Sequence, residues 1–588
     1  MPSFADEKKL IRYNRFLLLV AGLGGLLYGI DVGIIGGAVP YLEATSHLTP
    51  GELSIIVAAV LLGSVFSTLF AGLLADWMGR KPLMILSGVA FTLSIPMIAL
   101  SQGYSALFFG RLLQGMSGGL VGVVVPLYLA ECLSAQKRGR GTAVFQWLLT
   151  FGIFAAAIIG VLVSYHVDAV SRTGTADAVF NVKNHAWRNI FWISMPPGLL
   201  FVLGSFFVSE SPRWFFRRGE SGKAYAALLR SRSEAQAALE LREMEETATE
   251  VHAKSDARQG RSEPLLQRRY VIPFLLACVI LSCNTATGIN SVIGFNTNIL
   301  ISSGLNDIQA HWGYVIFTAM NFLFTMVGMS LVDRKGRKFL FLLGTSGIIL
   351  SLSTVAFLFV SQEKHRVDVS PQVRQMVMPE QSLNLTFDDA MLARIAPDQP
   401  RPGNAQSLTI IYSYGDFTSS TAPAVSNLIA PTPVEIDRTH SIPAGKVQAF
   451  FQNPFADLNT ARTAPLKIDH AYIQTVPSEG TGWFMAICLY LFVAFYATGP
   501  GVCVWLALSE LMPTRIRSNG MSIALVLNQL VSTALAAIFL PVVGKHGYST
   551  MFFLFVGFTV IYFLTVLFFL PETKGKTLEE IEKHFETA

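Results

Sequence analysis

Twelve runs of predominantly apolar residues divide this chain, and each is long enough to cross a lipid bilayer. A membrane-spanning helix needs about 20 such residues. Of the 588 residues, 52% are hydrophobic and only 14% are charged, whereas soluble domains carry roughly 25% charged residues. Because one soluble core cannot bury so much apolar surface, we expect an all-α membrane protein. The runs are 16–39, 53–73, 83–101, 105–130, 142–164, 189–209, 271–302, 311–332, 338–360, 482–509, 518–542 and 549–570.

Basic residues between the runs predict the orientation in the membrane. They cluster in alternate connections, as in Lys8–Arg15, Arg80–Lys81 and Arg334–Lys338, whereas the connections after the first, third and seventh runs hold no Lys or Arg. Short basic loops stay on the cytoplasmic side. We therefore expect both termini in the cytoplasm and the chain in a cell membrane, inner or plasma.

Two connections are long. Residues 210–270 are charged and rich in Ala, Glu and Arg, and predict cytoplasmic linker helices. Residues 361–481 fall on the opposite side and form an extracytoplasmic insertion between the ninth and tenth spans. Its patches of alternating apolar residues predict a small, mostly β or irregular cap; a disordered loop is the alternative. The halves are then 1–209 and 271–360 with 482–570, and 571–588 is a cytoplasmic tail.

The two halves repeat charged landmarks in the same order. Asp76 and Arg80 follow the second span, and Asp333 and Arg337 follow the eighth; SESPR and PETKG follow the sixth and twelfth. Glu131 follows the fourth span and Glu510 follows the tenth. Asp76 and Glu131 are 55 residues apart, whereas Asp333 and Glu510 are 177 apart. The difference between these two intervals matches the length of the insertion. Two six-span repeats related by an axis along the membrane normal are the major facilitator architecture.

The repeated acids and bases predict a latch at the cytoplasmic helix ends. If these charges only fixed the orientation of the chain in the membrane, basic residues alone would be enough. The acids therefore suggest ion pairs that hold neighbouring helices together and break as the protein changes conformation. The predicted latch residues are Asp76, Arg80, Glu131, Arg138, Glu210, Asp333, Arg337, Glu510 and Arg517.

Several motifs together resemble those of the sugar porter family. They are GGLLYGIDVGIIGGA in the first span, the repeated D-x-x-x-R and E-x₆-R landmarks, SESPRW, GIN in the seventh span and PETKGKTLEEIE after the twelfth. The resemblance covers nearly the whole chain except 361–480. It implies a secondary transporter similar to bacterial xylose–proton and hexose–proton symporters and to facilitative glucose transporters.

Asp31 and Arg111 are charged residues inside apolar runs. Charge at membrane depth is costly, so such residues are expected to pair and to serve function. The resemblance implies the same, because Asp31 matches the aspartate of the proton symporters, where facilitative transporters have asparagine. A conformational change that separates Asp31 from Arg111 would then load and release a proton. A static structural ion pair is the alternative.

Amide side chains both donate and accept hydrogen bonds, as sugar hydroxyls do, so amides within the spans are candidate ligands. The resemblance implies substrate contacts by Gln146, Asn290, Asn321, Trp505, Asn528 and Tyr28. Asn284 and Thr285 replace the family's paired glutamines, and Gly294 and Phe295 replace its paired tyrosines. We include Asn284, Thr285 and Phe295 in the predicted site. Fewer and shorter polar groups favour a larger or differently hydroxylated ligand than glucose or xylose.

The remaining residues exclude other chemistries. The five cysteines lack metal-site spacing, and no catalytic triad, nucleotide loop or basic nucleic-acid stripe occurs. We therefore expect that the protein is not an enzyme and binds no cofactor, metal or nucleic acid. We expect a monomer that binds and transports a sugar together with protons. The alternatives are a facilitative sugar or polyol uniporter and a nutrient sensor; the short tail disfavours the sensor.

Overall fold

The fold is taken from a computed structural model of the chain. It describes residues 4–46, 48–133, 135–258, 267–397, 405–421, 423–426, 433–443, 445–446, 449, 453, 456–512, 516–574 and 585. Within these ranges, twelve helical segments are long and apolar enough to cross a membrane. The predicted number of spans is therefore found.

The first six spans form one half of the membrane domain. They are α1 (Phe4–Thr45), α2 (Pro50–Met78), α3 (Arg80–Ala99), α4 (Tyr104–Cys132), α5 (Ala135–Thr173), and α6 (Ala176–Ile193) with α7 (Met195–Phe207). The last six spans form the other half. They are α11 (Arg268–Ala286) with α12 (Ile289–Ser302), α13 (Asp307–Lys335), α14 (Arg337–Glu363), α20 (Glu479–Thr498) with α21 (Pro500–Leu511), α22 (Arg517–His546) and α23 (Tyr548–Phe569).

Three spans are each interrupted by a break in the helix. Pro196 and Pro197 follow the break at Ser194, and Pro500 follows the break at Gly499; proline is well tolerated in the first turn of the new helix. In the seventh span the chain breaks at Gly288, whose φ of +87° is left-handed. A side chain there would also collide with the Phe555 ring, because its Cβ would lie 2.5 Å from a ring carbon.

Two helices run well beyond their apolar sequences. The fifth run ends at residue 164, but α5 continues to Thr173, and α6 begins at Ala176 rather than near residue 189. Thr175 caps α6 by accepting a hydrogen bond from the Ala178 N–H, and Trp187 and Ile190 are buried. These extensions are amphipathic, so a search for uniformly apolar runs does not detect them.

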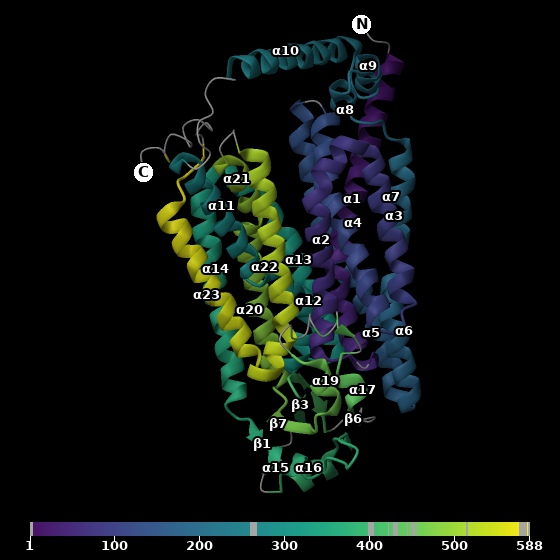
Figure 1. Ribbon diagram of the computed structural model, residues 1–588, viewed down its shortest axis with the longest axis vertical. Helices are drawn as coiled ribbons and strands as arrows, with labels where there is room; N and C mark the ends of the chain where they lie inside the picture. The colour runs from purple at the N-terminus through teal and green to yellow at the C-terminus, as the bar shows by residue number, and fades with distance from the viewer. Residues whose placement is uncertain are drawn as a thin grey trace.

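The molecule has two distinct ends (Figure 1). Near one end, where α1 begins and α23 ends, lie the linker helices α8 (Pro212–Arg217), α9 (Ser221–Leu229) and α10 (Glu234–Arg258); we call this the terminal end. The segment between α14 and α20 covers the other end, which we call the insert end. Across the two halves, α2 packs on α22, α5 on α13 and α1 on α12.

The insert (residues 364–478) is a small α+β unit with its own hydrophobic core. An antiparallel sheet has the strand order β1-β7-β3-β4, with β5 paired to β3, and β2 pairs with β6. Strand β4 contacts both α2 and α22, so the insert touches both halves. Its elements are β1 (Val367–Asp368), α15 (Ser370–Arg374), β2 (Leu383–Thr386), α16 (Asp389–Ile395), β3 (Gln406–Tyr414), β4 (Phe417–Ser420), β5 (Ala424–Val425), β6 (Pro433–Ile436), α17 (Arg438–Ser441), α19 (Leu458–Thr463) and β7 (Leu466–Thr475).

Candidate functional site

Arg80 lies at the centre of a charged cluster at the terminal end of the first half. Its guanidinium is buried and contacts Glu131 (Nε–Oε2, 2.9 Å) and Asp76 (Nη2–Oδ1, 3.0 Å). Its backbone N–H donates to Glu210 Oε1 at 3.0 Å, and the Ser211 hydroxyl donates to Glu131 at 2.5 Å. The cluster joins the ends of α2, α3 and α4 to the start of the linker.

The second half repeats this arrangement around Arg337. Its Nη2 lies 2.9 Å from Glu510 Oε1, its backbone N–H donates to Glu572 Oε1 at 3.0 Å, and Thr573 donates to Glu510 at 2.6 Å. The sequence repeat is thus also a repeat of hydrogen bonds, each set confined to one half. The side chains of the predicted latch residues Arg138, Asp333 and Arg517 lie outside the described residues.

Among the residues that the structure describes, hydrogen bonds between the two halves occur only from the middle of the membrane domain to the insert end. Asn298 Nδ2 donates to Glu43 Oε2 at 2.5 Å, and Tyr41 donates to Asp307 Oδ2 at 2.7 Å. The other cross-half hydrogen bonds among the described residues are Thr297–Gly36, His311–Gly37, Tyr314–Gly33, Trp312–Tyr165, Leu540–Ser54 and Gln529–Ser64. The insert end is therefore closed, which is the pattern of an inward-facing state if the terminal end is cytoplasmic.

Asp31 and Arg111 are both buried inside the first half. Asp31 lies in α1 with no exposed surface, and neither of its oxygens has a hydrogen-bond partner among the described residues. Arg111 of α4 donates from Nη1 to Gln114 Oε1 at 2.6 Å, and its guanidinium carbon is 5.7 Å from the centre of the Phe191 ring. Each charge acts on the other electrostatically, but the predicted ion pair is not formed in this conformation.

Gly118 of α4 makes room for Asp31. A Cβ at this position would lie 2.6 Å from Asp31 Oδ2 and 3.2 Å from the Tyr28 ring. Gln529 of α22, in the other half, donates from Nε2 to the Ser64 hydroxyl of α2 at 3.4 Å. Gln529 directly follows Asn528, one of the predicted substrate residues.

The break in the seventh span places three predicted residues near its unwound turn. Asn284 donates from Nδ2 to the Tyr496 hydroxyl at 3.1 Å, and its Oδ1 is buried without a partner among the described residues. Asn290 donates to the Ser532 hydroxyl at 2.7 Å. The Thr285 hydroxyl donates to the Asn528 carbonyl at 3.2 Å. A discontinuous helix that presents polar groups at mid-membrane is typical of transporter binding sites.

The other predicted substrate residues are more dispersed. Asn321 of α13 and Asn528 of α22 are 8% and 6% exposed, Gln146 of α5 is half-buried, and Trp505 of α21 is exposed. Phe295 is fully buried and stacks on Phe539 with ring centres 4.6 Å apart. It therefore belongs to the packed insert end in this state.

Asn296 is a further candidate that the family pattern did not select. It has no exposed surface, and neither its amide oxygen nor its nitrogen has a partner among the described residues. Buried amides are nearly always hydrogen-bonded. An unpaired buried amide inside α12 suggests a group whose partner arrives with a ligand or a change of conformation. Its only sequence signal is that it is an amide in an apolar run.

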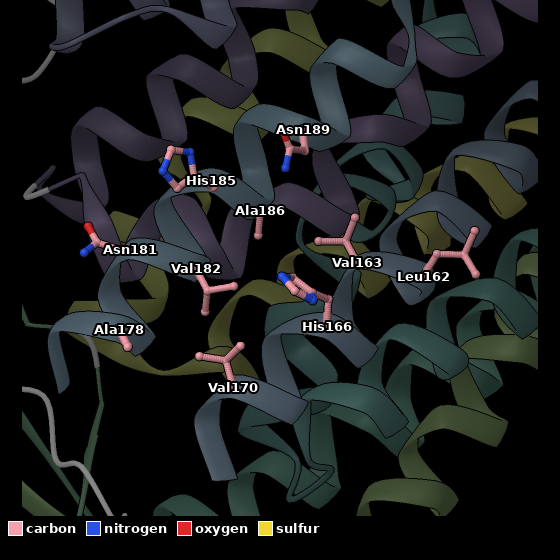
Figure 2. A pocket seen from close by; sticks show the side chains of 10 residues that line it. All are labelled: Leu162, Val163, His166, Val170, Ala178, Asn181, Val182, His185, Ala186 and Asn189. Carbon is pink, nitrogen blue, oxygen red and sulfur yellow. The ribbon is translucent and has the colours of Figure 1, made fainter. Parts of the chain in front are cut away.

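A groove on the outside of the first half lies apart from these residues. It holds about 470 Å³ between the extensions of α5 and α6. Figure 2 shows His166 and Val170 on one side and Asn181, His185 and Asn189 on the other. None of the predicted site residues lines it.

Comparison with known proteins agrees with this architecture. The family described as Sugar (and other) transporter matches residues 17–378 and 466–585. The human proton myo-inositol cotransporter is 26% identical, over 97% of this chain and 82% of its own length. The glucose transporter GlcP of Staphylococcus epidermidis is 25% identical, over 97% of both chains.

Solved structures show the same fold. The xylose transporter XylE from E. coli, in a partially occluded inward-open conformation, aligns with a TM-score of 0.63 and 19% identity, over 96% of this chain and 100% of XylE. These relatives are transporters, not enzymes. With a family match over most of its length and the two six-helix halves of the major facilitator fold, the chain belongs to the Sugar (and other) transporter family.

Proposed function

We propose that the protein is a secondary active transporter that carries a monosaccharide or related cyclic polyol together with protons. The observation that supports coupling best is Asp31, a fully buried acid whose oxygens both lack partners among the described residues. An ionised carboxylate at this depth is costly without a partner. Asp31 must therefore hold a proton, or approach Arg111 when it gives the proton up.

The proposed cycle links the protonation of Asp31 to the opening of each end of the molecule. In the present state the halves are bonded at the insert end. Opening that end requires α1 to move relative to α12 and α13, because their hydrogen bonds cross the seam. Asp31 lies on α1, and in the proposed cycle α1 also shifts against α4 within its own half, which changes the distance between Asp31 and Arg111. A proton can thus be bound from one side and released to the other.

The broken seventh span and its neighbours support a ligand site with several amides. Asn284 and Asn296 carry unpaired amide atoms, while Asn290 and Thr285 bond to α22. The relatives named for myo-inositol and glucose support a ring bearing several hydroxyls as cargo. The shorter side chains at residues 284 and 285 favour a cargo larger than xylose.

We further propose that the terminal end faces the cytoplasm, that the insert lies outside the cell, and that the transporter works as a monomer in the cell membrane. The basic connections support this orientation. The two repeated charged clusters would then brace the cytoplasmic ends of each half while the halves rock against each other.

Uptake by purified protein in liposomes tests the proposal. Labelled xylose, glucose and myo-inositol are supplied with and without an inward proton gradient. We expect at least one to accumulate above its external concentration only when the gradient is present. Equal, purely downhill entry with and without the gradient would instead identify a uniporter, and no saturable entry of any cyclic polyol would refute the substrate class.

A further inference from the structure

His311 lies fully buried near the start of α13, at the seam between the halves. Its Nδ1 is 2.8 Å from the carbonyl oxygen of Asp307, and its Nε2 is 3.2 Å from the carbonyl oxygen of Gly37 in α1. Carbonyl oxygens only accept hydrogen bonds. A neutral imidazole has one N–H and one bare nitrogen, whereas the imidazolium ion has two N–H groups. Only the protonated ring can therefore make both bonds.

The surroundings suit a positive charge. Nδ1 is also 3.4 Å from Asp307 Oδ1, and Oδ2 of the same carboxylate accepts from the Tyr41 hydroxyl. The Tyr41 ring lies parallel to the imidazole, with centres 5.4 Å apart. Such stacking favours a cation over a neutral ring.

The other charges near this cluster come from α5 and α6. Asp168 of α5 acts electrostatically on Tyr41, and Lys183 of α6 acts on Asp307. Asp168 is itself paired with Arg172 at 2.8 Å. Gly160 of α5 packs against the His311 ring without adding charge. Asp307 is thus the carboxylate in direct contact with His311, and the imidazolium is compensated locally.

We propose that His311 is a second proton-binding site, occupied when the insert end closes. Its Nε2 bond reaches α1 of the opposite half and exists only while the halves are joined there. When the insert end opens, the Gly37 carbonyl moves away from His311 and water enters. The second N–H then loses its acceptor in the protein, so the protonated ring is no longer favoured. Imidazole is the side chain that ordinarily changes charge between about pH 5 and 8. Closure of this end therefore takes up a proton on His311.

The direction of the pH effect follows from linkage. A state that binds one more proton is favoured as the pH falls, and the ratio of closed to open molecules changes by up to about tenfold per pH unit. This inference stands whether or not Asp31 couples transport to protons, because it rests on a different side chain at a different depth.

The distance between spin labels across the insert end reports closure directly. Gly103, between α3 and α4, and Gly480, at the start of α20, are suitable sites. A Cβ at Gly103 would meet no atom within 4 Å, and one at Gly480 would meet only the Ser478 hydroxyl, at 4.0 Å. The native cysteines are buried, so labels attach to G103C and G480C. We expect the short-distance population to grow as the pH is lowered from 8 to 5.

Three variants separate His311 from other proton sites. H311Q should flatten the pH dependence, whereas the matched control H166Q, an exposed histidine of α5, should leave it unchanged. The dependence should persist in D31N. An unaltered pH dependence in H311Q would overturn the proposal; a loss in D31N with retention in H311Q would assign the effect to Asp31 instead.

A second measurement covers the case in which H311Q does not fold. In wild-type protein labelled with ¹⁵N-histidine, one of the ten histidines should show two protonated ring nitrogens near pH 7 in the closed state. D307N should lower the closed population and move its pH dependence to lower values. Only neutral tautomers at neutral pH in the closed state would refute a protonated His311.

Discussion

Asp31 Oδ2 and Gly118 lie so close that a methyl group on residue 118 would stand 2.6 Å from the carboxylate oxygen. The G118A variant must therefore displace Asp31 or Tyr28, and an overpacked buried site costs about 1–3 kcal/mol. We expect proton-driven uptake to fall at least about fivefold with the protein still in the membrane. The matched control is G72A, because a Cβ at Gly72 in α2 meets nothing within 4 Å. Equal uptake by the two variants would show that the packing around Asp31 is not critical.

The substrate amides give a second prediction. Q146A and N290A each remove one bifunctional group, and a lost hydrogen bond costs about 1–2 kcal/mol, or roughly 5- to 30-fold in affinity. The half-saturation constant for the identified cargo should rise by this amount at unchanged surface expression. Q102A, an exposed amide between α3 and α4, serves as the control. Normal binding by both Q146A and N290A would place the site elsewhere.

Asn296 extends this test to an amide that the family pattern did not select. Its amide has no partner among the described residues in the present state. The N296L variant therefore loses no hydrogen bond within the protein, and the stability of the ligand-free protein should not fall for that reason. We expect near-normal thermal stability and weakened cargo binding. If N296L instead lowers stability while binding is normal, Asn296 has a structural partner in another state rather than a role in the site.

Glu210 predicts a pH-dependent stability. Burial raises the pKa of this carboxyl, and the backbone N–H groups of Ser211, Arg80 and Lys81 only partly offset that effect. The folded protein then keeps the proton to higher pH than the unfolded chain. Its contribution is fully present below the unfolded pKa, near pH 4.5, and is lost as the pH rises through the folded pKa.

Melting curves against pH measure this contribution. E210Q cannot titrate, so the slope of Tm above about pH 4.5 should become shallower than in wild type. E220Q, which alters an exposed acid paired with Lys223 in the same region, should keep the wild-type slope. A slope that is the same in all three proteins would mean that Glu210 is not buried as described.

The insert is predicted to be dispensable for the core cycle. It has its own hydrophobic core, and it supplies none of the predicted site residues. Replacing residues 364–478 by a short Gly/Ser linker should preserve folding and gradient-driven uptake. Because β4 touches both α2 and α22, we also expect the insert end to open more readily. A folded, membrane-inserted deletion variant that carries nothing would make the insert part of the mechanism.

Much of this architecture could be predicted from the sequence, because lipid imposes length and apolarity on each span. The break at Gly288 could not, because the run 271–302 is continuous in the sequence and a left-handed residue leaves no mark beyond one glycine among many. Glu131 shows a similar limit. Its spacing to Arg138 is visible in the sequence, but its contact with Arg80 depends on which helix ends meet in space.

The sequence predicts which types of side chain form the candidate site, but not which of them are already hydrogen-bonded within the protein. Amides in apolar runs are easy to find, yet the sequence does not distinguish Asn290, bonded to Ser532, from Asn296, whose amide lacks a described partner. The insert shows the same contrast. The alternating segment SLTIIYSYGD contains most of β3 (Gln406–Tyr414), whereas most of KVQAFF lies outside the described residues.

The most direct test of coupling compares wild type with D31N in liposomes under an inward proton gradient. We expect wild-type protein to accumulate its cargo, and added cargo to drive protons inward, detected by a pH dye inside the liposomes. D31N should exchange labelled for unlabelled cargo at a measurable rate, yet neither accumulate cargo nor move protons. Undiminished accumulation or cargo-driven proton entry in D31N would contradict the assignment of coupling to Asp31.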